Sequence, residues 1–193
     1  MAQHILSFLK SLDSGWFFSI NHGLHNIFFN GVMPLISNSG SGGLIWISFG
    51  LALLLLGSRE TKKASVIMLF ALFISFLLGE EVLKFLFHRA RPFETLPGVY
   101  LLVPPPHSYS FPSAHAANAF ASAMVLARKI PVLSLPVNIF AVVMAFSRVY
   151  VGVHYPLDVL AGAALGAVCA AFVLKYEDVI FGAAGRVKPP FIP

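Results

Sequence analysis

The chain of 193 residues has little charge and almost no cysteine. Asp, Glu, Lys and Arg make up 11% of the residues, whereas about 25% is usual in a soluble domain. So few charges do not cover the surface of a soluble globule, and a hydrophobic content of 58% excludes a disordered chain. The single cysteine, Cys169, excludes a disulfide framework and a cysteine-based metal site. The composition therefore predicts an integral membrane protein with one domain.

The formal net charge of +5 does not indicate a nucleic-acid partner, because the 13 Lys and Arg residues are spread over the whole chain. Their positions are more informative about topology, since cytoplasmic loops of membrane proteins are enriched in Lys and Arg. Three groups of cations lie between or after apolar runs and are expected to share the cytoplasmic side. They are Arg59, Lys62 and Lys63; Arg128 and Lys129; and Lys175, Arg186 and Lys188.

Five apolar runs predict an all-α polytopic bundle with about five transmembrane helices. The runs cover residues 44–56, 64–87, 113–128, 131–146 and 156–174. Most are slightly shorter than the ~20 residues that cross the hydrocarbon layer, so little tilt is expected. The last run is rich in Gly and Ala, which favours close helix packing.

Residues 1–40 are expected to form N-terminal interfacial helices, without a cleaved signal peptide. The apolar spacing in residues 1–13 suits a short amphipathic helix on the membrane surface, and residues 16–37 are too interrupted by polar residues for a clear span. The predicted organisation is one domain, 1–193, with interfacial helices in 1–40, a transmembrane catalytic core in 41–176 and a cytoplasmic tail in 177–193. Within the core, four prolines make residues 96–111 a loop that is long enough to be functional.

Four cations lie at the non-cytoplasmic ends of the predicted spans: Lys84, Arg89, Arg91 and Arg148. Cations on that side run against the topology bias, which points to a function. Lys84 and Arg91 are seven residues apart, so they are predicted to share one helix face, and Pro92 is predicted to end that helix at Arg91. Snorkelling of the long side chains to the interface is the alternative.

Two further groups of polar residues lie on the same predicted side. Ser113 and His115 open an apolar run, so Ser113 is a predicted helix N-cap, and a helix N-terminus suits an anion such as phosphate. His154 and Asp158 are four residues apart, a spacing at which a carboxylate can orient an imidazole. Each group also has a plain structural interpretation: a helix cap, a hydrogen-bonded histidine at an interface, and a structural His–Asp pair.

Together the groups form an ordered pattern: Lys84-x6-Arg91-Pro92, Pro112-Ser113-Ala114-His115 and Ser147-Arg148-x5-His154-x3-Asp158. In this pattern the chain resembles the type 2 phosphatidic acid phosphatase (PAP2) superfamily. That superfamily includes bacterial lipid phosphate and undecaprenyl pyrophosphate phosphatases, and the vanadium haloperoxidases are its relatives. The resemblance implies a PAP2/haloperoxidase-like helical core. One departure is Ala114, where the family usually has Gly; Ala keeps the backbone N–H and changes only how closely a substrate can approach.

The resemblance implies a phosphatase that works through a phosphohistidine intermediate. His154 would be the nucleophile, Asp158 would orient it, and His115 would be the general acid. The phosphate would be held by Lys84, Arg91, Ser113, Ala114 and Arg148. The role of Arg89 stays open: it either contacts the substrate or is structural.

No metal or other cofactor is expected. His22 and His25 are three residues apart, but a polar face of an interfacial helix explains them more simply than metal binding. The expected partners are the bilayer and a lipid phosphate substrate, since a site at the membrane surface reaches a lipid's phosphate while its chains stay in the bilayer. The expected location is the inner (plasma) membrane, with several spans and a site that faces the periplasm or extracytoplasmic side.

Undecaprenyl pyrophosphate is slightly favoured as substrate over phosphatidic acid, phosphatidylglycerophosphate and lipid A phosphate. A lipid phosphotransferase on the same fold is the main alternative. A transporter is disfavoured, because the ionisable residues gather at one face and no inverted repeat is apparent. A haloperoxidase is disfavoured by the membrane-dominated composition. The oligomeric state is left open.

Overall fold

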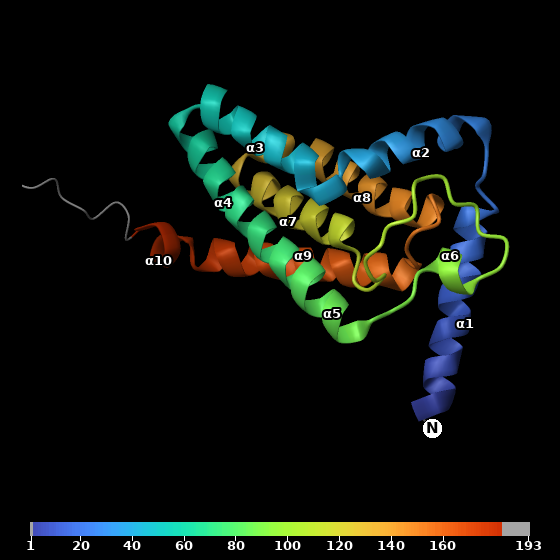
Figure 1. Cartoon of the computed structure of the whole chain (residues 1–193). Helices are drawn as coiled ribbons and strands as arrows, with labels where there is room; N and C mark the ends of the chain where they lie inside the picture. Colours follow the sequence, from blue (N-terminus) through green and yellow to red (C-terminus); the bar gives the residue numbers. More distant parts are fainter. Residues whose placement is uncertain (1, 183–193) are drawn as a thin grey trace, which may run out of the picture.

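The computed structural model describes residues 2–182, and every regular element in this range is a helix. Four helices form the main bundle: α4 (Arg59–Phe76), α7 (Ala114–Lys129), α8 (Ser134–Tyr150) and α9 (Pro156–Lys175). Helix α7 packs against the other three, so it lies in the middle of the bundle. Figure 1 shows α1 (Ala2–Asn21) crossing the end of the bundle at which the long loop after α6 (Pro92–Thr95) lies. The all-α prediction is confirmed.

Each of the five predicted apolar runs forms a helix close to its predicted bounds. Residues 44–56 form α3 (Leu44–Leu56), and residues 156–174 form α9. Residues 64–87 belong to α4, which continues through a π-helical segment, η2 (Leu77–Leu83), into α5 (Lys84–Phe87). The fourth run begins with a 3₁₀ turn, η3 (Pro131–Leu133), and continues as α8 to Tyr150, one turn further than predicted.

Three helical stretches of the described residues are long and apolar enough to cross a membrane: Arg59–Thr95, Pro131–Tyr150 and Pro156–Lys175. A fourth is added if α2 (Ile27–Ser39) and the stretch Ser41–Leu56, which meet at a 54° bend, make one broken span. Helix α7 is only 16 residues long. Its neighbours cover it, and many of its buried residues are alanines, so it contributes to the bundle without the length or hydropathy of a span.

The N-terminal region differs from the predicted division at residue 13. Helix α1 continues through Asp13 to Asn21, and the Asp13 side chain is fully buried instead of marking the end of a surface helix. The reason is that the Asp13 carboxylate has partners from other parts of the chain, which are described below. The break comes at residues 22–26, where Oδ1 of Asn26 accepts a hydrogen bond from the Phe29 N–H at 2.9 Å and caps α2.

Two glycines of α9 allow it to approach α7 closely. A Cβ atom on Gly162 would lie 2.3 Å from the Ser113 carbonyl oxygen, and one on Gly166 would lie 2.1 Å from the Ala117 carbonyl oxygen. Both distances are far below van der Waals contact, so no larger residue fits without moving a helix. The small residues of the fifth run therefore bring the N-terminus of α7 against the first turns of α9.

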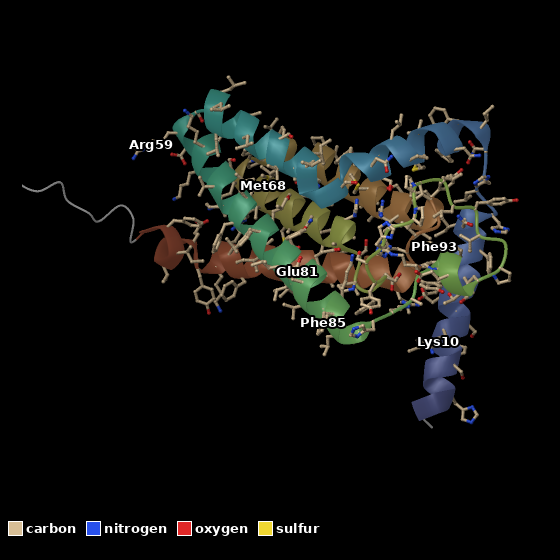
Figure 2. The ribbon with its side chains drawn as sticks, in the orientation of Figure 1. Lys10, Arg59, Met68, Glu81, Phe85 and Phe93 are labelled. Atoms are coloured by element: carbon tan, nitrogen blue, oxygen red, sulfur yellow. The ribbon has the colours of Figure 1, made fainter. Side chains whose placement is uncertain are left out.

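The cations predicted for the cytoplasmic side and those predicted for the other side lie at opposite ends of the bundle, as predicted. Figure 2 shows Arg59 at the end far from Phe93, and Lys129, at the end of α7, forms a 2.6 Å ion pair with Glu177 of α10 (Glu177–Gly182). Of the predicted tail, α10 covers residues 177–182, while Arg186 and Lys188 lie outside the described residues.

Candidate active site

The predicted site residues come from five helix ends and the turns beside them. Lys84 opens α5, Arg91 directly precedes α6, Ser113 and His115 begin α7, Arg148 lies in the last turn of α8, and Asp158 lies in the first turn of α9. His154 lies in the turn between α8 and α9. The hydrogen bonds and ion pairs described below connect these positions at one end of the bundle.

Lys84 and Arg91 meet, but not in the predicted way. The helix that carries Lys84 ends at Phe87, because His88 adopts a left-handed conformation with φ 47°, and Arg91 is extended. The prediction of one shared helix face is therefore wrong. The long loop brings the two cations together instead: Lys84 Nζ donates to Ser108 Oγ at 2.9 Å, and Arg91 Nε donates to the Ser108 carbonyl at 2.7 Å.

The Arg91 guanidinium is buried and held by backbone carbonyls. Nη1 donates to the Val153 carbonyl at 2.7 Å, and Nη2 donates to the Tyr109 carbonyl at 3.1 Å. Nη1 also lies 3.3 Å from Nε2 of His154. Because a guanidinium only donates hydrogen bonds, this contact makes Nε2 the acceptor and puts the proton of a neutral His154 on Nδ1.

His154 and Asp158 are neighbours, with Nδ1 and Oδ2 3.6 Å apart, which is too long for a direct hydrogen bond. Oδ2 of Asp158 accepts instead from Ser110 Oγ at 2.5 Å and from the Tyr155 N–H at 2.9 Å. The carboxylate thus faces the ring nitrogen that carries the proton, and other groups fix its position.

His154 is 1% exposed. Burial lowers the pKa of the His154 imidazole well below its usual value, and the nearby Arg91 and Arg148 cations lower that pKa further. The ring is therefore neutral at neutral pH. A neutral imidazole with an unprotonated Nε2 is the nucleophilic form of histidine.

A cavity of about 470 Å³ lies beside these residues. Lys84, Ser108, Ala114, His115 and Arg148 are among the residues that line it. The cavity walls therefore present two cations, an imidazole and the start of helix α7. The N–H groups in the first turn of a helix lack intrahelical acceptors, so this helix end adds donors for an anion.

Several buried polar atoms around the cavity have no hydrogen-bond partner within residues 2–182. They include Ser113 Oγ, His115 Nε2, Arg148 Nε, Asn118 Oδ1 and His154 Nδ1. Buried polar groups are usually paired, so a cluster of unpaired ones indicates a place for a polar ligand. Ser113 stands at the predicted N-cap position, but its hydroxyl does not cap α7, which leaves it available for such a ligand.

Three residues near the site carried no signal strong enough for sequence reasoning. Ser108 and Ser110 lie in the long loop, where side-chain direction follows no period. Ser37 of α2 accepts a hydrogen bond from Arg148 Nη1 and is fully buried. Glu80 forms a 2.6 Å ion pair with Lys84, and its i, i+4 spacing is a signal that the sequence did offer.

Arg89 has two carboxylate partners, which answers the question left open by the sequence. Nη1 donates to Asp158 Oδ1 at 2.5 Å, and Nη2 donates to Asp13 Oδ2 at 2.6 Å. Arg89 therefore contacts the site through Asp158, and together with Asp13 and Tyr155 it lines a separate hollow of about 660 Å³.

The two N-terminal histidines pack on the long loop. His22 Nε2 lies 2.9 Å from the Gly98 carbonyl oxygen, and the His25 ring stacks on Tyr100 with centroids 4.3 Å apart. Both residues thus join the turn between α1 and α2 to the loop.

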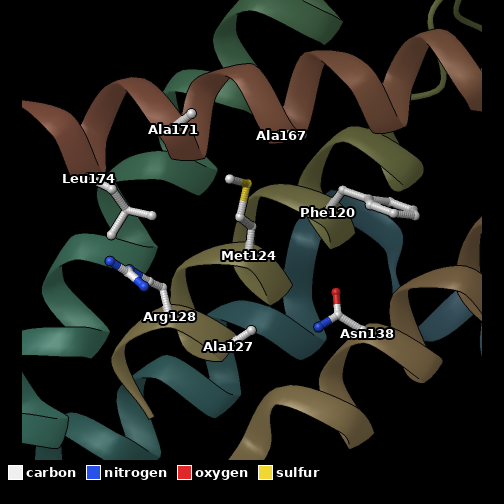
Figure 3. Close-up of a pocket in the computed structure, with 8 residues that line it drawn as sticks. All are labelled: Phe120, Met124, Ala127, Arg128, Asn138, Ala167, Ala171 and Leu174. Atoms are coloured by element: carbon white, nitrogen blue, oxygen red, sulfur yellow. The ribbon is translucent and has the colours of Figure 1, made fainter. Parts of the chain in front are cut away.

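Another hollow, of about 530 Å³, lies among α7, α8 and α9 near Arg128 (Figure 3). Phe120, Met124 and Leu174 are among its mostly apolar lining residues. None of the predicted site residues lines it, so we assign the candidate site to the cationic cavity.

Comparison with known proteins agrees with the pattern of motifs. The undecaprenyl-diphosphatase of Sulfolobus acidocaldarius is 39% identical over 138 residues, which is 71% of this chain and 65% of that relative's own length. A transmembrane PAP2-type phosphatidylglycerolphosphate phosphatase from Bacillus subtilis superposes with a TM-score of 0.71 at 28% identity, over 93% of this chain and 89% of that one.

A bacterial vanadium-dependent iodoperoxidase shares the fold alone, with a TM-score of 0.62 at 16% identity over 75% of this chain and 43% of that one. The predicted PAP2/haloperoxidase-like core is thus confirmed. The apolar helices and the membrane relatives make the chain a multi-pass membrane protein. The family model of the PAP2 superfamily matches the sequence over residues 63–181, which include all three motifs. The chain therefore belongs to the PAP2 superfamily.

Proposed function

We propose that this protein is a metal-independent lipid phosphatase that hydrolyses lipid phosphate or pyrophosphate monoesters. The observation that carries the proposal is the contact between Arg91 Nη1 and His154 Nε2, which leaves Nε2 of the buried imidazole unprotonated within a cluster of cations. The names of the relatives, an undecaprenyl-diphosphatase and a phosphatidylglycerolphosphate phosphatase, support phosphate removal from lipids.

In the first step, Nε2 of His154 attacks phosphorus and the bond from phosphorus to the leaving oxygen breaks. His115, in the imidazolium form that the bound anionic phosphate favours, gives a proton to that oxygen, which leaves as an alcohol or a lipid phosphate. The cations Lys84, Arg91 and Arg148, with Ser113 and the Ala114 N–H, stabilise the charge on the three equatorial oxygens. Positioning and charge stabilisation are the main requirements of phosphoryl transfer, and the cavity supplies both.

In the second step, His115 takes a proton from water as the water oxygen attacks the phosphohistidine. Phosphate leaves and His154 returns to its neutral form. While the phosphoryl group is on Nε2, the ring carries a positive charge. The Asp158 carboxylate, 3.6 Å from Nδ1, stabilises that charge electrostatically.

The site belongs to the extracytoplasmic side of the inner (plasma) membrane in this proposal. The support is the separation of the cations: Arg59, Arg128 and Lys175 lie at helix ends far from the site, and the positive-inside rule assigns such an end to the cytoplasm. A lipid's phosphate then enters from the outer leaflet while its chains stay among lipids.

Undecaprenyl pyrophosphate is slightly favoured as the substrate. The 39% identity to an undecaprenyl-diphosphatase supports this choice. The Bacillus subtilis structure keeps phosphatidylglycerophosphate as an alternative, beside phosphatidic acid and lipid A phosphate.

The test is phosphate release by purified protein in detergent from a panel of these four lipids, with EDTA present. We expect release that His154→Ala abolishes and that His4→Ala, a change at an exposed residue of α1, leaves intact. Normal release by His154→Ala contradicts the mechanism. Label that moves from a phosphate-labelled donor into an acceptor lipid, with none released as phosphate, makes the protein a phosphotransferase.

A further inference from the structure

Helix α1 places a buried carboxylate beside the site. The reaction described above does not use this carboxylate. Asp13 is fully buried, although it lies more than 70 residues away in sequence from the nearest site residue, Lys84. A buried carboxylate is costly unless it is paired and hydrogen-bonded. Its partners therefore indicate what it does.

Both oxygens of Asp13 have partners close to the reacting histidine. Oδ2 lies 2.6 Å from Arg89 Nη2, and Oδ1 accepts a hydrogen bond from the Leu157 N–H at 2.9 Å. Leu157 is the second residue of α9, so Asp13 satisfies a free N–H at the start of the helix that carries Asp158. The contact is a side-chain cap at the start of α9, supplied by another helix, beside the contact of Asp158 with the Tyr155 N–H.

Arg89 continues the connection to Asp158. Its Nη1 donates to Asp158 Oδ1 at 2.5 Å, and its guanidinium lies over the Tyr155 ring, 4.1 Å from the centroid. One planar guanidinium thus bridges two carboxylates, with a fixed direction for each hydrogen bond.

We propose that Asp13 is a positioning residue, which acts through Arg89 and the start of α9 to hold Asp158 against His154. This inference rests on the proposed function of His154. Two carboxylates and one guanidinium leave this group with a net charge of −1. Asp158 therefore still stabilises the positive charge that develops on the His154 ring. In a single Arg89–Asp158 pair, the arginine would largely cancel this stabilisation.

Docking of α1 does not depend on Asp13 alone. Phe17 is fully buried and packs on Tyr155, with ring centroids 5.8 Å apart. Asn21 donates to the Tyr100 and Tyr150 carbonyls at 2.9 and 2.8 Å. A change at Asp13 is therefore expected to leave the helix in place and to act on the site.

The informative variant is Asp13→Asn, because it keeps an oxygen for the Leu157 N–H and removes the charge that holds Arg89. We expect kcat to fall about 10- to 100-fold, the range for removing a partner that orients a reacting group, while KM stays within about 3-fold. Asp13→Glu restores the carboxylate and is expected to recover part of the loss. Asp178→Asn, at an exposed position of α10, is the matched control and is expected to behave as wild type.

A second measurement needs no substrate. In protein labelled with [15N]histidine, the signal that disappears in His154→Ala belongs to His154. We expect its Nδ1 shift to change in Asp13→Asn and in Arg89→Lys, and to stay unchanged in Asp178→Asn.

Wild-type kcat in Asp13→Asn, or an unchanged His154 signal, overturns the proposal. The proposal is also overturned if a lower melting temperature of Asp13→Asn accounts for its loss of kcat. The melting temperature of Phe17→Ala is measured in parallel for this comparison. If wild type releases no phosphate from any lipid, the proposed function fails by itself, and the His154 signal then decides the role of Asp13.

Discussion

Nη1 of Arg91 lies 3.3 Å from Nε2 of His154, and the same Nη1 is anchored 2.7 Å from the Val153 carbonyl. The backbone next to the histidine therefore positions the guanidinium. This arrangement makes Nε2 the acceptor, and it places a cation where the oxygens of an attacked phosphoryl group would lie.

Arg91→Lys is expected to lower kcat/KM about 100-fold, because a lysine cannot reproduce the fixed set of donors that stabilises the transferred group. Three backbone carbonyls, of Ser108, Tyr109 and Val153, accept hydrogen bonds from the arginine. Steady-state kinetics in detergent checks this. Arg128→Lys, at an exposed position in the far hollow, is the matched control, and equal losses in the two variants would contradict the assignment.

The pH profile follows from the lowered pKa of His154, whose ordinary value is 6.5. Protonation blocks the nucleophile, so activity is lost as pH falls through the pKa of the folded protein. Because that pKa is lowered, the loss of kcat/KM that results from protonation of His154 is expected only below pH 6.5. A [15N]histidine titration measures the same group without substrate. Protonation of His154 at or above pH 6.5 would contradict this account.

Ser37→Ala is expected to weaken substrate binding, with KM raised about 10-fold, because a hydrogen bond to a charged group contributes about 1.5–3 kcal/mol. The Ser37 hydroxyl is buried and accepts from Arg148 Nη1, so its loss releases a cation that lines the cavity. Ser39→Ala is a suitable control, since Ser39 Oγ donates only locally, to the Ile36 carbonyl. If both variants have the KM of wild type, Ser37 has no part in placing Arg148.

Gly166→Ala tests the close packing that brings α7 to α9. The added Cβ would meet the Ala117 carbonyl oxygen at 2.1 Å, so the helices must separate. The free energy of unfolding is expected to fall by about 1–3 kcal/mol, the usual cost of overpacking. Gly31→Ala, on α2, meets no atom within 4 Å and is expected to leave the melting temperature unchanged or slightly raised. Equal melting temperatures for both variants and wild type would contradict the packing.

The sequence predicted the helices well, because apolar runs with clear ends specify them directly. It predicted about five spans, whereas three helical stretches in residues 2–182, or four with the bent pair, are long and apolar enough to cross a membrane. It also predicted the cations and histidines of the candidate site, and the structure brings them to one end of the bundle. It could not predict the hydrogen bonds of Ser108 and Ser110, because a loop without periodicity gives no direction for its side chains. The early end of the helix after Lys84 was missed, because the left-handed His88 carries no strong sequence signal.

The role of Asp13 was missed for a different reason. A single carboxylate in an amphipathic stretch is most simply a surface residue. Only the tertiary structure brings it to Arg89 and Leu157.

The central claim is that His154 receives the phosphoryl group, and trapping the intermediate tests it most directly. Wild-type protein is mixed with 32P-labelled lipid substrate, quenched within milliseconds in alkali and digested for mass spectrometry. The account predicts label on the peptide that contains His154, stable in alkali, labile in acid and absent from His154→Ala. Label on another residue, or turnover by wild type with no covalent label at any quench time, would contradict it.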